Sequence, residues 1–196
     1  VRDGVGSTAE QYSRNRYDPE YEKEYGLTAY LEHDFPKEDH KVRLECTTSR
    51  SLEEEDNRYT NVYSSPAGTT TFDNTLNQQD DRENQLSLDY SNPLSEHSSL
   101  EAGYSGEFRS NDLDFHADSF DPAGQTFVPD SARSNRFLYD GSIHAFYCTY
   151  KQSFGAFGFL AGLRAEQSST TADLVTRDSI VSNNYGNLFP TLHLSY

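Results

Sequence analysis

The residues of this chain that could do chemistry are mainly acidic, and many of them fall in one run, NDLDFHADSFD at 111–121. Carboxylates at alternate positions offer the oxygen ligands that Ca²⁺ takes in proteins. A loop of the EF-hand type also needs a glycine at its sixth position and a closing glutamate, and this run has neither. The main interpretation is a solvated acidic segment, and Ca²⁺ binding is the alternative. The residues concerned are Asp112, Asp114, His116, Asp118 and Asp121.

The other reactive side chains do not form a catalytic pattern. No histidine has a second histidine or cysteine at metal-ligand spacing, and the sequence contains no G-x-S-x-G, P-loop or dinucleotide-binding motif. The two cysteines, Cys46 and Cys148, lie far apart in the chain. Two unrelated thiols are the favoured interpretation, with a disulfide as the alternative. We therefore expect neither enzymatic activity nor a cofactor. The acidic run SLEEEDN at 51–57 is interpreted as solvated.

The composition restricts the class of protein that must position these residues. The chain has 196 residues, a formal net charge of −16 and only 34% hydrophobic residues, yet it contains 14 Tyr and 12 Phe. The acidic balance excludes nucleic acid as a partner, because a phosphate backbone selects Lys and Arg. Abundant aromatic residues with few aliphatic ones favour β-strands. No apolar run is long enough for a membrane-spanning helix.

Apolar and polar residues alternate with a period of two in three pairs of segments, which predicts three β-hairpins. The hairpins are expected at about 25–50, 85–108 and 142–166, and a last strand at 188–196. The turns within the hairpins are short. The segments between them are long and rich in Asp, Asn, Ser and Thr, so they are expected to be loops at 50–83, 109–136 and 167–187.

Short turns on one side and long polar loops on the other are typical of a transmembrane β-barrel. We therefore predict an all-β fold, an antiparallel up-and-down barrel section of about seven strands within a single section at 1–196, located in the outer membrane of a Gram-negative cell and in contact with its lipid. Aromatic residues at the strand ends are expected to form the interfacial girdles. These are Tyr25, Phe35, Tyr90, Phe108, Phe137, Phe154 and Phe157.

The stretch FGFLAGLRAE at 157–166 shows the expected division into two faces. Its odd positions are apolar and are predicted to face lipid, whereas Arg164 and Glu166 are predicted to face the barrel lumen. There they would line a transport path, form an internal ion pair or simply face the water of the lumen. In the following NLFP motif, Pro190 is expected to begin the last strand and Phe189 to anchor it at the interface.

Three ordered segments carry a resemblance to a known family: DYSNPLSEHSSLEAGYSGEFRSND, IHAFYCTYKQSFGAFGFLAGLRAEQSST and NNYGNLFPTLHLSY. They resemble the outer-membrane β-barrel family of TonB-dependent receptors, especially the Bacteroidetes type. The resemblance is closest at 85–196 and looser at 17–84. It implies a large barrel with a plug domain, which imports a scarce small-molecule, glycan or peptide ligand with energy from an inner-membrane complex. This chain would then be only a middle section of such a barrel.

Two other classes stay open at the level of the sequence. One is a small outer-membrane barrel that does not transport, which would need residues 8–20 to supply an eighth strand. The other is a soluble lipocalin-like carrier, which would need the apolar phase of the strands to point inward. The ligand itself is not encoded in any motif of the sequence.

Overall fold

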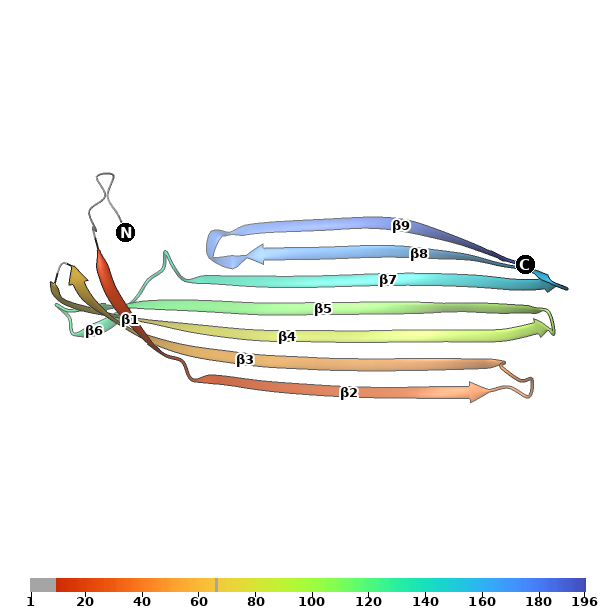
Figure 1. Ribbon diagram of the computed structural model, residues 1–196, viewed down its shortest axis with the longest axis horizontal. Helices are drawn as coiled ribbons and strands as arrows, with labels where there is room; N and C mark the ends of the chain where they lie inside the picture. The colour runs from red at the N-terminus through yellow and green to blue at the C-terminus, as the bar shows by residue number, and fades with distance from the viewer. Residues whose placement is uncertain (1–9, 66) are drawn as a thin grey trace.

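The computed structural model describes residues 10–65 and 67–196, which form one elongated antiparallel sheet (Figure 1). No helix in these residues is long and apolar enough to span a membrane. The strands are β1 (Gln11–Tyr17), β2 (Glu20–Asp34), β3 (Lys41–Ser65), β4 (Ala67–Ser95), β5 (Ser98–Asp121), β6 (Thr126–Pro129), β7 (Asn135–Phe154), β8 (Phe157–Leu174) and β9 (Ser179–Ser195), with a 3-10 turn η1 (Val175–Arg177) before β9.

The nine strands in the described residues occupy seven positions across the sheet, so the predicted all-β antiparallel section of about seven strands is confirmed. Strands β1 and β2 both pair with β3, one beyond the other, and β6 and β7 share the edge of β5 in the same way. The break between β1 and β2 falls at Asp18 and Pro19, where proline lacks a backbone donor. The Pro19 carbonyl still accepts a bond of 3.1 Å from the Asp56 amide.

The predicted long loops at 50–83, 109–136 and 167–187 are wrong for most of their length, because strands continue through them. In the described residues, the chain leaves strand geometry in these segments only at 122–125, at 130–134 and at 175–178. The physical reason is that a strand bonded on both sides satisfies its backbone whatever its side chains are. Where both faces of a sheet meet water, neither face needs to be apolar, so the alternation of apolar and polar residues that predicts a strand is absent.

Register and alternation place most apolar side chains of the strands near the short turns on one face, which we call the outer face. A single row of directly paired residues crosses all seven positions of the sheet on this face: Leu31, Leu44, Leu88, Tyr104, Phe146, Ala165 and Leu188. With the rows beside it, this row forms an apolar belt near the three short turns. We call that end of the sheet proximal, the opposite end distal and the opposite face inner.

The apolar belt is the height expected for a bilayer. On β4 and β5 it covers residues 86–94 and 100–108, close to the roughly 9–11 residues that a tilted strand needs to cross. Its side chains are exposed, as with Leu31 at 71% and Phe146 at 62%. The buried apolar residues in the described part of the chain are only Ala117 and Ala145. The fold therefore has its hydrophobic surface outside, where lipid would cover it.

In the third hairpin, the odd and even positions of 157–166 lie on opposite faces, as predicted. Phe159 and Leu163 are on the outer face, where they pair with Gln152 and Cys148, and Arg164 is on the inner face. Three details of the prediction are wrong. Phe137 and Phe189 belong to the inner face by their register, so neither joins an interfacial girdle. Pro190 pairs with Leu163 in the middle of β9, which it can do because β9 is an edge strand with one open side.

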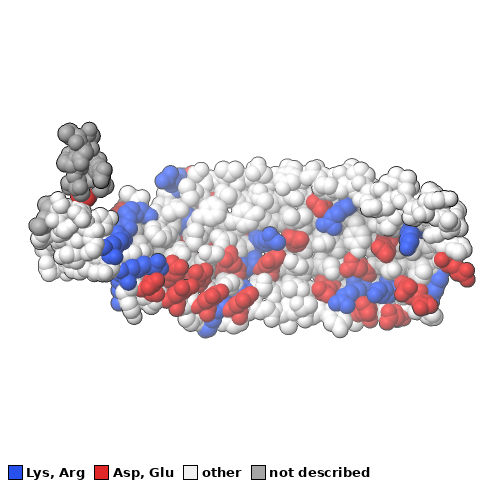
Figure 2. All heavy atoms as spheres, viewed as in Figure 1, with Lys and Arg blue, Asp and Glu red and all other residues white. Residues whose placement is uncertain are grey.

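The strands continue far beyond the apolar belt. Strand β4 has 29 residues, or about 95 Å at 3.3 Å per residue, which is several times the thickness of a hydrocarbon core. On the face shown in Figure 2, acidic and basic side chains gather over the side of the sheet formed by β2, β3 and β4. These side chains lie along that side at both ends of the sheet. The distal part differs in its outer face, where β5 carries Asp112 and Asp114, so it is a polar extension of the membrane wall.

Candidate ligand-binding site at the distal end

A nearly buried carboxylate marks the distal end of the inner face. Asp73, on β4, is only 8% exposed. Its Oδ2 lies 2.8 Å from Nη2 of Arg14 on β1 and 3.5 Å from Nη2 of Arg133. The amide of Asn61 on β3 donates to Asp73 Oδ1 over 2.8 Å. Two cations and an amide donor thus compensate one buried charge, as burial of a carboxylate requires.

This cluster ties together segments that are far apart in the sequence. The Arg14 guanidinium also stacks over the Tyr59 ring, 3.7 Å from its centroid, so the side chain is fixed from two directions. Arg133 belongs to the segment 130–134 between β6 and β7. That segment is held to β5 by a 2.8 Å bond from the Asp130 amide to the Ala117 carbonyl, and Ser134 Oγ donates to the Asp130 carbonyl. The cluster therefore fixes the shape of the distal end.

One acceptor in the cluster is without a donor. Asn61 is 5% exposed, and its amide nitrogen donates to Asp73 and to Thr71 Oγ1, which leaves Asn61 Oδ1 buried and unpaired in the described structure. A buried unsatisfied acceptor costs about 1–3 kcal/mol. Such groups in native proteins usually have a donor from an ordered water or a ligand.

A pocket of about 460 Å³ adjoins this cluster through Arg133. It lies between the 130–134 segment and η1. The start of β7 is joined to η1 by a hydrogen bond of 2.8 Å from the Arg136 amide to Thr176 Oγ1. The pocket has two guanidinium groups and no carboxylate side chain in its lining. The lining residues are Ser131, Ala132, Arg133, Ser134, Asn135, Leu174, Thr176 and Arg177.

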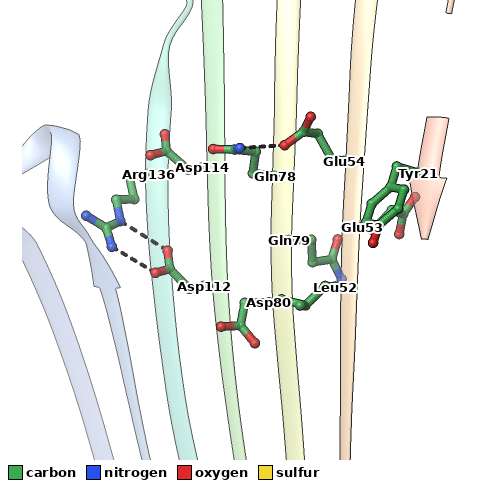
Figure 3. Close-up of a pocket in the computed structure, with 10 residues that line it drawn as sticks. All are labelled: Tyr21, Leu52, Glu53, Glu54, Gln78, Gln79, Asp80, Asp112, Asp114 and Arg136. Atoms are coloured by element: carbon green, nitrogen blue, oxygen red, sulfur yellow. Dashed lines mark hydrogen bonds and ion pairs between the residues drawn. The ribbon is translucent and has the colours of Figure 1, made fainter. Parts of the chain in front are cut away.

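A second hollow, of about 390 Å³, lies beyond the apolar belt across β2, β3, β4, β5 and β7 (Figure 3). Its charged groups are largely paired already. Arg136 donates two bonds of 3.0 and 2.8 Å to Asp112, which lowers the pKa of that carboxyl. Hydrogen bonds from Arg50 and Arg82 hold the pKa of Asp80 well below its usual range. The paired groups make this hollow a weaker candidate than the distal pocket.

The acidic run at 111–121 does not assemble into a Ca²⁺ site. Asp112, Asp114 and Asp118 lie two or four positions apart along the outer face of β5, so they are spread by about 7 Å for each pair of residues. Asp121 is on the opposite face and accepts bonds from the amides at 123 and 124. The main interpretation, a solvated acidic run, agrees with this arrangement, although the run is a strand and not a loop.

The structure forms another acidic group that the sequence did not predict. Carboxylate oxygens of Glu20, Glu53 and Glu55 lie within 4.8 Å of one another. Partial burial, and then the neighbouring carboxylates, raise the pKa of Glu53. Glu20 is more than 30 positions from the other two in the sequence and meets them only through the pairing of β2 with β3. Only the topology of the sheet could have revealed this group.

Arg164 and Glu166 form an ion pair on the inner face, which was one of the expectations, with 2.5 Å between Nε and Oε1. Cys46 and Cys148 are free. They lie on β3 and β7 with β4 and β5 between them, which is about 14 Å of sheet. The disulfide alternative is thereby excluded, because a disulfide needs Cα atoms within about 7 Å.

The comparisons with known proteins place this wall in a family. No curated protein sequence matches the chain. Its fold is similar to the crystal structure of the ferric citrate transporter FecA in the unliganded form, with a TM-score of 0.57 and 12% sequence identity. The similarity covers 91% of this chain and 25% of that one, so the chain spans about a quarter of the length of that transporter. Residues 33–196, which include the apolar belt on six of the seven positions of the sheet, match the outer membrane protein beta-barrel family. The chain therefore belongs to this family and is a protein of the outer membrane.

Proposed function

We propose that the chain is a wall section of an outer-membrane receptor that imports a scarce ligand with energy from the inner membrane. The proposal includes a parent barrel of the TonB-dependent, Bacteroidetes type, in which this chain is a middle section and a plug domain closes the lumen. Ligand would bind at the distal end of the inner face, and the plug would then rearrange to release it inward. No covalent chemistry is assigned to the chain.

The observation that carries the proposal is the distal extension of the strands. A barrel that only seals or anchors has no need for strands such as β4, whose 29 residues reach far past the membrane. At the end of this extension, the buried Asp73 cluster and the pocket beside Arg133 offer a fixed polar surface. The described sheet also has open edges, at β1 and β2 on one side and at β6 and β9 on the other, as a section of a larger barrel requires.

The alternatives differ in what they ask of these features. A small barrel that does not transport would use the same apolar belt, and the distal pocket would then serve binding alone. A soluble lipocalin-like carrier does not agree with the outer-membrane family, and it would need the belt residues, such as Leu88 and Phe146, to surround an internal cavity.

Uptake by whole cells tests the proposal. Cells with and without the full-length protein would be given radiolabelled ferric citrate, cobalamin or a maltooligosaccharide, with and without an uncoupler of the inner-membrane proton gradient. We expect the protein to raise the uptake of at least one probe, and the uncoupler to abolish that rise. Uptake that persists with the uncoupler would indicate a passive barrel and overturn the proposal of energy coupling.

A further inference from the structure

We infer that the distal pocket between the 130–134 segment and η1 binds a small oxyanion, as a phosphate or a carboxylate group of the ligand. This inference names the ligand class of the site on which the proposed function rests. The charge of the pocket lining is opposite to that of the chain as a whole. In a chain with 32 acidic and 16 basic residues, a pocket of about 460 Å³ is lined by Arg133 and Arg177 and by no carboxylate.

Several hydrogen-bond donors in the pocket are unused in the described structure. The side chains of Ser131, Asn135 and Arg177 make no hydrogen bond or ion pair with the residues that the structure describes. Arg133 uses one Nη atom, at 3.5 Å from Asp73, and a guanidinium has five N–H donors. Guanidinium groups bind phosphate and carboxylate through pairs of parallel hydrogen bonds, which are about twice as strong as neutral ones.

The backbone segments that carry the two arginines are held by local hydrogen bonds. The Asp130 carboxylate accepts 3.2 Å bonds from the Ala132 and Arg133 amides, so it shapes the segment and does not line the pocket. On the other wall, Asp178 adopts a left-handed backbone (φ 50) and its amide bonds to the Val175 carbonyl over 3.2 Å, which closes η1 directly after Arg177. A site built on such a frame loses little entropy when it binds.

The neighbouring hydroxyl groups of the pocket cannot neutralise the charge of the two arginines. Ser134 Oγ and Thr176 Oγ1 already bond to the backbone, at Asp130 and Arg136. They can orient a ligand but do not neutralise charge. Because the two cations line one cavity that has no carboxylate in its lining, both attract an anion that enters it, and a doubly charged oxyanion is attracted most strongly.

The test is a binding measurement on the full-length protein in neutral detergent at low ionic strength. Isothermal titration would use inorganic phosphate, succinate and, as an uncharged probe, maltose. We expect phosphate, succinate or both to bind, with an affinity that falls as salt is added. Binding of one anion only identifies the chemical group, and binding of both indicates a general oxyanion site. Maltose bound as well as the anions, or no anion bound at about 10 mM, would overturn the inference.

Three variants locate the binding. Arg177→Gln removes a side chain without partners and should weaken anion binding at least about tenfold, as expected for one charge-assisted hydrogen-bonding group. Arg133→Gln should do the same, and its fold is checked by its melting temperature because Arg133 also contacts Asp73. The matched control is Arg136→Gln, which removes the same charge from a nearby position that is paired with Asp112 outside the pocket. Equal weakening in the control would indicate a general charge effect and contradict the site.

The experiment separates this inference from the proposed function. Binding is measured on purified protein without an energy source, whereas import is measured in cells with an uncoupler. Anion binding that depends on Arg177, in a protein that gives no energy-dependent uptake, would leave the pocket intact and remove the transport proposal. If uptake is energy-dependent and unchanged in Arg177→Gln, and the purified protein binds no anion, the transport proposal stands and the oxyanion site is contradicted.

Discussion

The same strands carry different side chains on their outer face in the proximal part, which lies in the membrane, and in the distal part beyond it. In its proximal part, β5 carries Leu100, Ala102 and Tyr104 on the outer face, and in its distal part the same face carries Asp112 and Asp114. The backbone pairing is continuous across the change. Hydrogen bonding between strands therefore forms the sheet in both parts, and the surrounding solvent determines whether the outer-face side chains are apolar or polar. In lipid the outer face must be apolar, whereas in water it is free to be polar.

The largest expected effect comes from moving a charge across this boundary. Leu88→Arg places a charge in the middle of the apolar belt and should lower the free energy of unfolding by about 2–4 kcal/mol, as for arginine at the bilayer midplane. Leu52→Arg makes the same change on the outer face of the distal part, opposite Asp80, and should cost less than about 0.5 kcal/mol.

Both variants would be refolded into lipid vesicles and unfolded with urea. A similar loss of stability in the two variants would mean that the boundary between the belt and the distal part is misplaced. A larger loss for Leu52→Arg would mean that lipid covers the distal part.

The next largest effect is expected at the Asp73 cluster, which stabilises the distal part, where no apolar belt is present. Asp73→Asn removes the charge that Arg14 and Arg133 share and leaves their guanidinium groups without it. We expect a local loss of about 1.5–3 kcal/mol, the range for hydrogen bonds to charged groups. Hydrogen exchange should speed up in β1 and in the 130–134 segment and stay unchanged in the belt part of β7 and β8.

The matched control for this variant is Asp140→Asn, on β7 and exposed, because its carboxylate has no hydrogen bond or ion pair in the described residues. Faster exchange in the belt as well as in β1 would show that the two parts unfold as one unit.

A smaller effect is expected within the wall itself, on its inner face. A Cβ added to Gly103 would lie 2.5 Å from the Leu88 carbonyl oxygen and from Tyr147 Oη. The Tyr147 ring lies across this glycine to reach Asp89, to which its hydroxyl donates. Gly103→Ala should displace the ring and cost about 1–3 kcal/mol, the usual range for overpacking. Urea unfolding in vesicles measures the loss.

The control is Gly26→Ala, also on an inner-face position, where an added Cβ meets nothing within 4 Å. Gly26→Ala should be neutral or slightly stabilising, because glycine weakens a strand interior. Equal destabilisation of the two variants would mean that the cost comes from the strand backbone and not from Tyr147.

The contrast between the two parts also explains how far the sequence predicts the structure. The belt strands around Leu88, Tyr104 and Leu163 were predicted because lipid on one face and water on the other impose a period of two. The distal strands were predicted as loops, since water on both faces imposes no period. The pairing of β1 and β2 with one edge of β3 could not be predicted, because it rests on the interruption at Pro19 and on contacts across long separations.

The candidate site was missed for the same reason. Asp73 is 59 positions from Arg14 and 60 positions from Arg133 in the sequence, and no motif joins the three residues. The acidic run at 111–121 suggests an ion site because its residues are adjacent in the chain, yet strand geometry spreads them along β5. The scarcity of basic residues is a signal in the sequence: in so acidic a chain, an arginine within a polar segment is expected to pair with a carboxylate.

The smallest expected effect tests whether surface ion pairs add order to the distal part. Arg50 donates two 2.8 Å bonds to Asp80, and Arg82 shares the same carboxylate. These bonds hold the pKa of Asp80 below its ordinary value of 3.8. A depressed carboxyl pKa contributes stability that is complete above the unfolded pKa and is lost as the pH falls through the folded one. The contribution should therefore be constant from neutral pH down to about pH 5 and decline below about pH 4.

Its size should be below about 1 kcal/mol, because the two guanidinium groups are largely exposed and water screens the pair. The measurement is hydrogen exchange at amides of β3 and β4 around Arg50 and Asp80, compared between pH 6 and pH 3 after correction for the intrinsic rate. Asp80→Asn should remove the pH dependence while leaving exchange in the belt unchanged. If the belt loses protection over the same pH range in both proteins, the acid effect comes from other carboxylates, and the order of the distal part rests on the Asp73 cluster and the strand pairing alone.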